Sequence, residues 1–400
     1  MGWITGGDKL VIRGGYTRTH DYAYTNIALN IWSSFPFVAA FNDANVPNAF
    51  ATLQTRVPVI QNLTRTQVTE DFHSPVYDSF SFELQREATR DLVFRVGYVG
   101  SKGSGLFESI DGNPVRFRTA IATDPLNPPT RTDPTIGPIR LRANSGSSIY
   151  HSLQASMEKR LSRGVSAGIH FTWSSFIDTM SEIFNNSNSE IALAQDPYNR
   201  RLDRGRSSYD RPLRLAGNFV YELPFYREQK GVGGHVLGGW QLNSNFNFQS
   251  GAPFSPLNNA DISGTLGGLA SAIGIATRAN VNTTLDVSRM TVEELFALRG
   301  TVSSTTGNAL FRALQPGERI GDAGRNILRA DGLNNVDFGI LKNTRIGENQ
   351  RLQIRADFFN FTNTRDFGTP NSVVTSPGFL RQWDTDGGNR RIIVGIRYVF

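Results

Sequence analysis

Alternation of apolar and polar residues over segments of roughly ten positions is the feature of this sequence that most limits its fold. The clearest case is the segment 240–249, in which Trp240, Leu242, Phe246 and Phe248 alternate with mostly amide side chains. Because successive side chains of a β-strand point to opposite faces, such a strand has one apolar and one polar face. The chain is therefore predicted to form sheet that separates an apolar medium from a wet one.

We expect ten such strands and a single convincing helix. The predicted strands cover residues 9–19, 76–87, 90–101, 149–161, 164–175, 212–223, 238–250, 335–346, 350–361 and 391–400. The predicted helix lies near 290–299, where Thr291 has the position of an N-cap and Glu293 and Glu294 follow in the first turn. The sequence thus predicts an all-β fold.

The connections between the predicted strands alternate in length. They are short at 88–89, 162–163 and 347–349, of medium length at 224–237, and long at 20–75, 102–148, 176–211, 251–334 and 362–390. A soluble meander has no reason to place its insertions at one end, whereas outer-membrane barrels have short periplasmic turns and long extracellular loops. With Phe400 on the periplasmic side, every long loop is extracellular. The pattern predicts an antiparallel transmembrane β-barrel.

Composition restricts the function. Hydrophobic residues make up 39% of the chain and charged residues 19%, and no apolar run approaches the roughly 18 residues of a membrane-spanning helix. Cysteine is absent and the five histidines are scattered, which excludes thiolate chemistry and zinc-type spacing. His151 and His170 are expected on the wet lumen face. No catalytic arrangement stands out, so we expect neither an enzyme nor a cofactor, and the net charge of +6 is too diffuse to indicate nucleic acid.

Aromatic residues fall near the predicted strand ends, as the two aromatic girdles of a membrane barrel require. For the periplasmic rim the prediction names Tyr221, Phe225, Tyr226, Trp240, Tyr398 and Phe400, and for the opposite rim it names Trp173, Phe176 and Phe254. The last strand places apolar side chains at every second position up to the terminal residue. This pattern looks like the signal that the barrel-assembly machinery engages by strand addition, and it comprises Ile392, Val394, Ile396, Tyr398 and Phe400.

A series of short motifs spans nearly the whole chain in order. They are Val11–Tyr16, Val96–Gly103, Tyr150–Gln154, Glu158–Gly164, Phe171–Ser174, Glu222–Phe225, Gly239–Leu242, Gln249–Gly251, Gly324–Asn326, Asp337–Lys342, Arg355–Asn360, Phe367–Gly368 and Arg397–Phe400. On these stretches the chain resembles the C-terminal half of TonB-dependent outer-membrane receptors of the Oar-like type, which carry a carboxypeptidase-regulatory-like domain at the N-terminus.

The resemblance implies a receptor in the outer membrane of a Gram-negative bacterium that takes up a bulky ligand with energy from TonB. Barrels of this kind have 22 strands and a plugged lumen, and their plug and TonB-binding segment lie N-terminal to the barrel. Residues 1–400 are therefore expected to be the C-terminal part of the barrel, without plug, TonB-binding segment or signal peptide. The ten strands could close by pairing 9–19 with 391–400, or form an open sheet with two exposed edges.

Three sets of residues are candidates for binding. Lumen-facing side chains would offer hydrogen bonds along a transport route, and we name Gln241, Asn243, Asn245, Asn247, Gln353, Arg355 and Asp357. In the densest basic run, Arg200, Arg201 and Arg204 could contact lipopolysaccharide phosphates, although an Arg–Asp network that orders the loop is the stronger interpretation. Asp384 and Asp386 resemble part of a calcium loop, but a hairpin turn explains them better because the closing Glu is missing.

Three functions remain open from the sequence. The first is an energised outer-membrane transporter. The second is a passive porin or a surface adhesin, which needs no plug. The third is a soluble carbohydrate-binding β-sandwich, which alternation and aromatic residues alone would also allow. Ligand identity cannot be read from the strands because specificity lies in the long loops.

Overall fold

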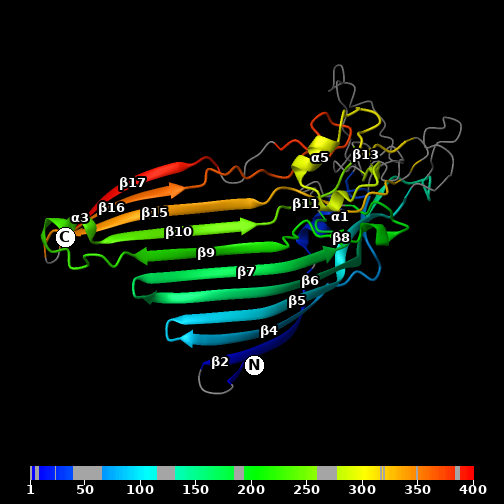
Figure 1. Cartoon of the computed structure of the whole chain (residues 1–400). Coiled ribbons are helices and arrows are strands. Elements are labelled where there is room, and N and C mark those ends of the chain that lie inside the picture. Colours follow the sequence, from blue (N-terminus) through cyan, green and yellow to red (C-terminus); the bar gives the residue numbers. More distant parts are fainter. Residues whose placement is uncertain are drawn as a thin grey trace, which may run out of the picture.

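The computed structural model describes residues 2–4, 9–22, 24–38, 65–114, 131–183, 193–258, 277–315, 318, 320–347, 350–382 and 388–400. Its main element is one large antiparallel sheet (Figure 1). The long strands are β2 (Leu10–His20), β4 (Val76–Thr89), β5 (Leu92–Asp111), β6 (Ile139–Ser162), β7 (Val165–Asp178), β9 (Leu213–Glu222), β10 (Trp240–Gln249), β15 (Leu333–Arg345), β16 (Arg351–Phe359) and β17 (Arg391–Val399).

All ten predicted strands are present, and each pairs with its neighbour in chain order, as expected of a barrel wall. Two of them are longer than predicted by about ten residues. β5 and β6 continue past the expected boundaries at 101 and 149, and the pairs from Ser104↔Ser147 to Asp111↔Arg140 are interrupted by bulges near Leu106. The expected 102–148 loop is therefore partly strand. Three short strands of this sheet were not predicted, namely β1 (Gly2–Ile4), β3 (Arg65–Val68) and β8 (Gly205–Arg206).

Turn geometry explains why the sheet is a series of hairpins. Between β6 and β7, Ser162 pairs with Val165, and the two residues between them have positive φ angles, 51° at Arg163 and 83° at Gly164. Two positive φ angles match the twist of a two-residue hairpin, and glycine accepts this conformation without strain. The short turns lie at one end of the sheet with α3 (Gly231–Leu237), and the long loops lie at the other end, which we call the outer end (Figure 1).

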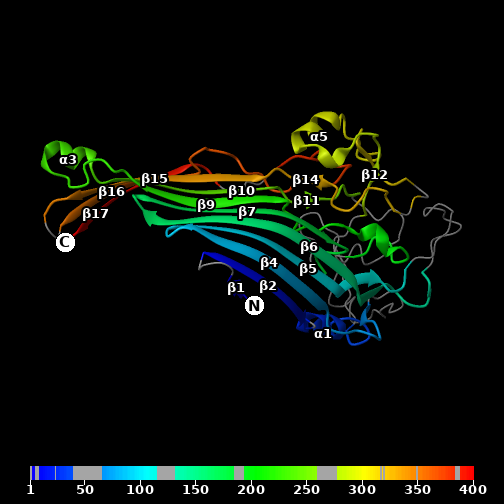
Figure 2. The ribbon, with the colours of Figure 1, turned by 60° about the horizontal axis from the view of Figure 1, so that its bottom comes forward.

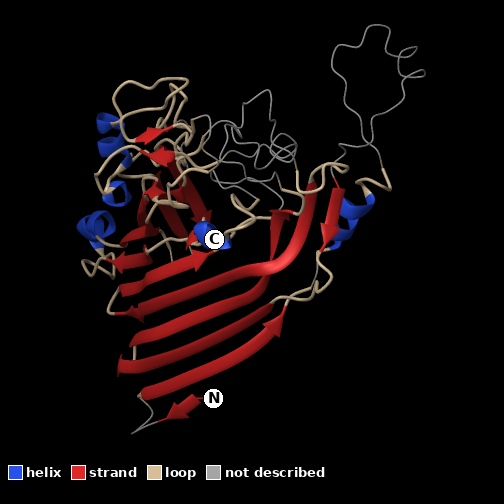
Figure 3. Cartoon of the chain, turned by 90° about the vertical axis from the view of Figure 1, so that its right-hand side faces the viewer, coloured by secondary structure: helices blue, strands red, loops and turns tan. Residues whose placement is uncertain are grey.

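The sheet is curved and open. Figures 2 and 3 show a single layer of tilted strands with the loops gathered at the outer end. Within the described residues, β17 pairs only with β16, and β2 pairs with β4 on one side and with the short β1 on the other. The pairing of 9–19 with 391–400 is thus not formed. The alternative of an open sheet with two edges is the one observed.

The long loops at the outer end contain a packed cap of their own. Its elements are β11 (Pro253–Phe254), β12 (Asn280–Val281), η2 (Val287–Arg289), α5 (Val292–Leu298), β13 (Phe311–Arg312) and β14 (Leu328–Arg329). Buried apolar side chains from these elements and from residues 374–380 form one cluster around Phe254, Leu295, Phe311 and Phe379. The predicted helix 290–299 is confirmed as α5, with Thr291 as N-cap in a complete capping box with Glu294.

The described helices do not include one that is both long enough and apolar enough to cross a bilayer. α1 (Thr25–Trp32) lies at the outer end, near the end of β2, where its contacts are with β3.

Candidate functional site

The apolar face of the sheet is exposed. One row of registered side chains crosses five strands: Phe82, Tyr98, Leu153, Trp173 and Leu213. Between 39% and 59% of each of these side chains remains accessible, although exposed apolar patches of this extent are rare on soluble proteins. No second sheet covers this face in the described residues, so the soluble β-sandwich is wrong. The exposed row is what a lipid-facing wall requires.

The opposite face is polar, and the register places all seven predicted lumen residues on it. Gln241 shares a row with Arg355, and Asn243 shares a row with Asp357, in each case across β15. Asn245 and Asn247 lie opposite Asp337 and Asn335. The Gln353 amide donates a hydrogen bond to Asn343 Oδ1 at 3.0 Å. These side chains form a hydrogen-bonding surface along β10, β15 and β16.

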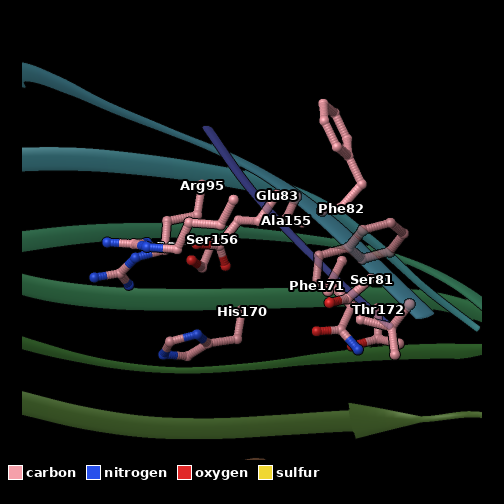
Figure 4. A pocket seen from close by; sticks show the side chains of 15 residues that line it. Ser81, Phe82, Glu83, Arg95, Ala155, Ser156, His170, Phe171 and Thr172 are labelled. Atoms are coloured by element: carbon pink, nitrogen blue, oxygen red, sulfur yellow. Dashed lines mark hydrogen bonds and ion pairs between the residues drawn. The ribbon is translucent and has the colours of Figure 1, made fainter. Parts of the chain in front are cut away.

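A second polar surface crosses β2 to β7 on the same face and surrounds a hollow of about 490 Å³, the inner hollow (Figure 4). Arg13 donates to Glu83 at 2.8 Å and to Gln85 at 2.7 Å. Arg95 donates to Glu158 at 2.5 Å, and His170 lines the same hollow. Charges of both signs are therefore paired across neighbouring strands, which keeps this part of the wall wet and ordered. Of these residues, only His170 was predicted from the sequence to lie on the lumen face.

The outer end of the same face holds another hollow, of about 460 Å³, which we call the outer hollow. It lies between the start of β4 and the ends of β5 and β7, and residues after β2 close one side. Its lining includes Tyr77 and Ser148, and these two share an inward row with Gly103 of β5. The paired inward residues Ser79 and Ser101 lie between the two hollows, and Ser81 of the next row lines the inner hollow. Polar side chains thus extend from the loop end of the sheet to the inner hollow.

Three predicted placements are wrong. His151 lies on the apolar face, in line with Leu153, where Tyr98 Oη and His151 Nδ1 are 2.6 Å apart. Phe176 points to the polar face, because it registers with Tyr150, and it lines the outer hollow instead of a girdle. Phe254 is fully buried in the cap. The error at His151 came from a miscounted alternation, and that at Phe254 from a tertiary core that local pattern does not show.

The basic run 198–214 lies in an ion-pair network at the outer end. Arg200 donates to Asp203 at 2.8 Å and also pairs with Glu108. Arg278 of the cap donates to the same Asp203 at 3.0 Å, and only 3% of each of these two residues is accessible. Because burial removes solvent from the guanidinium, the pKa of Arg278 is lowered, while Asp203 opposes that shift. These contacts tie the 193–211 loop to the cap.

The three arginines predicted to contact lipopolysaccharide therefore differ. Arg200 is held in the network, as the loop-ordering interpretation requires. Arg201 and Arg204 are exposed on the adjoining η1 turn (Arg200–Asp203) and its C-cap. The calcium candidates Asp384 and Asp386 lie outside the described residues. Elsewhere, the described part of the chain holds no group of three or more His, Asp or Glu side chains that could bind a metal ion.

Comparison with known proteins decides the family. The family model described as outer membrane beta barrel domain matches residues 3–393. The chain belongs to this family. The exposed apolar face of this outer-membrane barrel therefore contacts lipid in the outer membrane of a Gram-negative bacterium, and the long loops at the outer end are extracellular. A search of curated proteins found no match.

The barrel sheet is similar to several solved outer-membrane transporters. The transporter YddB from Escherichia coli is 13% identical with a TM-score of 0.48, over 98% of this chain and 39% of that one. The ferric enterobactin receptor PfeA from Pseudomonas aeruginosa, as the G324V mutant, is 10% identical with a TM-score of 0.45, over 100% and 39%. The FrpB iron transporter from Neisseria meningitidis is 10% identical with a TM-score of 0.42, over 100% and 38%. The chain spans less than two fifths of the length of these proteins.

Proposed function

We propose that this barrel is part of the wall and the extracellular loops of a TonB-energised receptor that imports a bulky ligand. The observation that carries the proposal is the pair of hollows on one polar face, with the inward side chains of Ser79 and Ser101 between them. A lipid-facing wall with a wet inner surface is what a route across the membrane needs. The motifs shared with Oar-like receptors, such as Gly239–Leu242 and Arg355–Asn360, support the energised mechanism.

We also propose that further strands complete the barrel. In the described residues β17 offers an unpaired edge, and β1 pairs with only Ile12 and its two neighbours on β2. An open edge in a membrane leaves backbone groups without hydrogen bonds, which costs several kcal/mol per group. A heat-sensitive, protease-resistant band formed in detergent by residues 1–400 alone would contradict this part of the proposal.

Planar-bilayer conductance separates energised import from passive diffusion. The receptor purified from the outer membrane should give no steady conductance, because the resemblance implies a plugged lumen, and it should retain the periplasmic domain of TonB on an affinity column. A porin would give open-channel steps and no TonB retention. An adhesin would show neither property but would bind cells to a surface. Open-channel steps in the untreated protein would therefore reject the proposed function.

Two interactions at the membrane surface belong to the same proposal. Exposed Arg201 and Arg204 would contact lipopolysaccharide phosphates, while Arg200 orders the loop. Replacing Arg201 and Arg204 with Gln should then reduce co-purifying lipopolysaccharide, whereas Arg200→Gln should chiefly increase proteolysis of the loop. The outward side chains of β17 and the terminal Phe400 would present the assembly signal to the barrel-assembly machinery; Val394 and Phe400 are 67% and 91% accessible.

A further inference from the structure

Five of the fourteen residues that line the outer hollow are aromatic. Tyr24, Tyr77, Phe107, Phe176 and Tyr209 come from five separate segments and meet around the same 460 Å³ space. It is within the size range of small-molecule sites. It lies at the extracellular end of the polar face, above the inner hollow, where a ligand that enters from outside could bind.

Three of the rings are fixed by packing against other rings. Phe107 is 7% accessible and stacks on Phe72 with ring centres 4.9 Å apart. Tyr24 meets the edge of Phe107 at 5.9 Å, with the ring planes at 66°. Phe176 makes a perpendicular contact with Tyr150 at 5.8 Å. The hollow therefore has preformed walls, and little ordering of side chains is needed when a ligand binds.

The charge around this space is negative. Asp21, Asp178 and Glu182 line it, and its described lining contains no Lys, Arg or His. Asp178 is neutralised by Arg325, which donates to it at 2.5 Å. Asp21 and Glu182 have no cationic partner among the ion pairs of the described residues, although the Glu182 carboxylate accepts a hydrogen bond from the Tyr209 hydroxyl. A second cation, Arg142, lies behind the wall and donates to the backbone oxygen of Ile183 at 2.5 Å.

Both carboxylates act at the same place. Burial raises the pKa of Tyr24, and the negative charges of Asp21 and Glu182 raise it further. The phenol therefore stays neutral at physiological pH and keeps its electron-rich face. A neutral aromatic wall beside two carboxylates attracts positive charge by two mechanisms, the ring quadrupole and the Coulomb interaction.

We propose that the outer hollow binds an organic cation, that is, an ammonium or guanidinium group carried by the imported ligand. A bare metal ion fits less well, because metal binding favours several oxygen or nitrogen ligands in one shell, and the described residues offer no such group. The inference rests on the proposed function for its biological role, since it names the chemical class of the ligand. Binding at the hollow can nevertheless be measured without transport.

The test compares two soluble probes that differ in one charge. N-acetylarginine amide carries a guanidinium, and N-acetylcitrulline amide is its neutral isostere. Saturation-transfer NMR on the purified receptor should show the arginine probe binding about tenfold more tightly than the citrulline probe, as expected for one cation near two carboxylates. Equal affinities, or no binding of the arginine probe, would overturn the proposal.

Variants locate the site. Glu182→Gln and Asp21→Asn should each weaken arginine-probe binding by about fivefold to tenfold and leave the citrulline probe unchanged. Glu293→Gln, an exposed carboxylate on α5, is the matched control and should have no effect. Tyr24→Phe should keep the preference for the cation, whereas Tyr24→Leu should reduce it about threefold. Cation binding that the two carboxylate variants do not change would place the site elsewhere and reject the inference.

The two proposals fail separately. If the receptor conducts ions as an open pore but still selects the arginine probe through Glu182, the import mechanism is wrong and the cation site stands. If it is plugged and retains TonB but binds both probes equally, the import mechanism stands and the cation site is wrong.

Discussion

An arginine in place of Phe246 should destabilise the folded protein strongly, because this side chain contacts lipid near the middle of the membrane. Phe246 is six residues from Trp240 at the short-turn end of β10. At about 3.3 Å per residue and a strand tilt of about 40°, that places it about 15 Å into an apolar band about 25 Å tall. Arginine on the lipid face near the midplane lowers the free energy of unfolding by about 2–4 kcal/mol.

The adjacent Asn245 provides the matched control. It lies at nearly the same depth but on the polar face, opposite Asp337 and Asn218, so Asn245→Arg should change the free energy of unfolding by less than about 1 kcal/mol. Phe246→Leu separates the loss of the ring from the introduction of charge. The assay is guanidinium unfolding of the receptor in phospholipid vesicles, followed by tryptophan fluorescence. An Asn245→Arg protein as unstable as Phe246→Arg would refute the assignment of faces.

Three further predictions concern the extracellular loops. Asp203→Asn removes one partner of the buried pair with Arg278 and should lower the stability of the cap by about 3–5 kcal/mol. The loss should be seen as faster amide hydrogen exchange in residues 277–281, and unchanged exchange would count against the network. Thr291→Ala removes the N-cap of α5 and should increase local opening of residues 292–298 by about 1 kcal/mol, with Thr291→Ser as the control that retains the cap. Arg312 lowers the pKa of Glu318 from its usual 4.5, so the pair stabilises the cap at neutral pH, and this stabilisation is lost as the pH falls below that value. Amide hydrogen exchange near β13 should therefore accelerate in acid, and Glu318→Gln should abolish this acid dependence.

The strands could be predicted because the alternation of apolar and polar side chains in a strand of a membrane barrel is visible in its own consecutive residues. In β10 apolar and polar side chains alternate along consecutive residues from Trp240 to Gln249, and no tertiary contact overrides this pattern. The signal that predicts helix α5 is equally local, since its capping box lies within Thr291–Glu294. Errors arose where strands continued beyond the apolar band, as at Asp111 of β5, because polar residues on both faces no longer mark a strand.

The candidate site could be predicted only in part. The polar residues of β10 and β16 were named from the alternation, whereas the outer hollow was missed. Its rings come from residues as far apart as Tyr24 and Tyr209. The pairing of β4, β5 and β7 within the sheet places Tyr77, Phe107 and Phe176 near one another, and loop residues supply Tyr24 and Tyr209. The same limit applies to Phe254, whose burial depends on packing against α5 and residues 374–380. No local signal distinguishes such residues from loop residues in general.

The most direct test of the central claim is an accessibility scan along β10 in the membrane. Single cysteines at positions 241–248, each carrying a spin label, would be measured by electron paramagnetic resonance against oxygen, which partitions into lipid, and a nickel chelate, which stays in water. Labels at 242, 246 and 248 should respond to oxygen, and labels at 241, 243, 245 and 247 should respond to the nickel chelate. Accessibility without this alternation, or with the opposite phase, would contradict a wall that faces lipid with its apolar side.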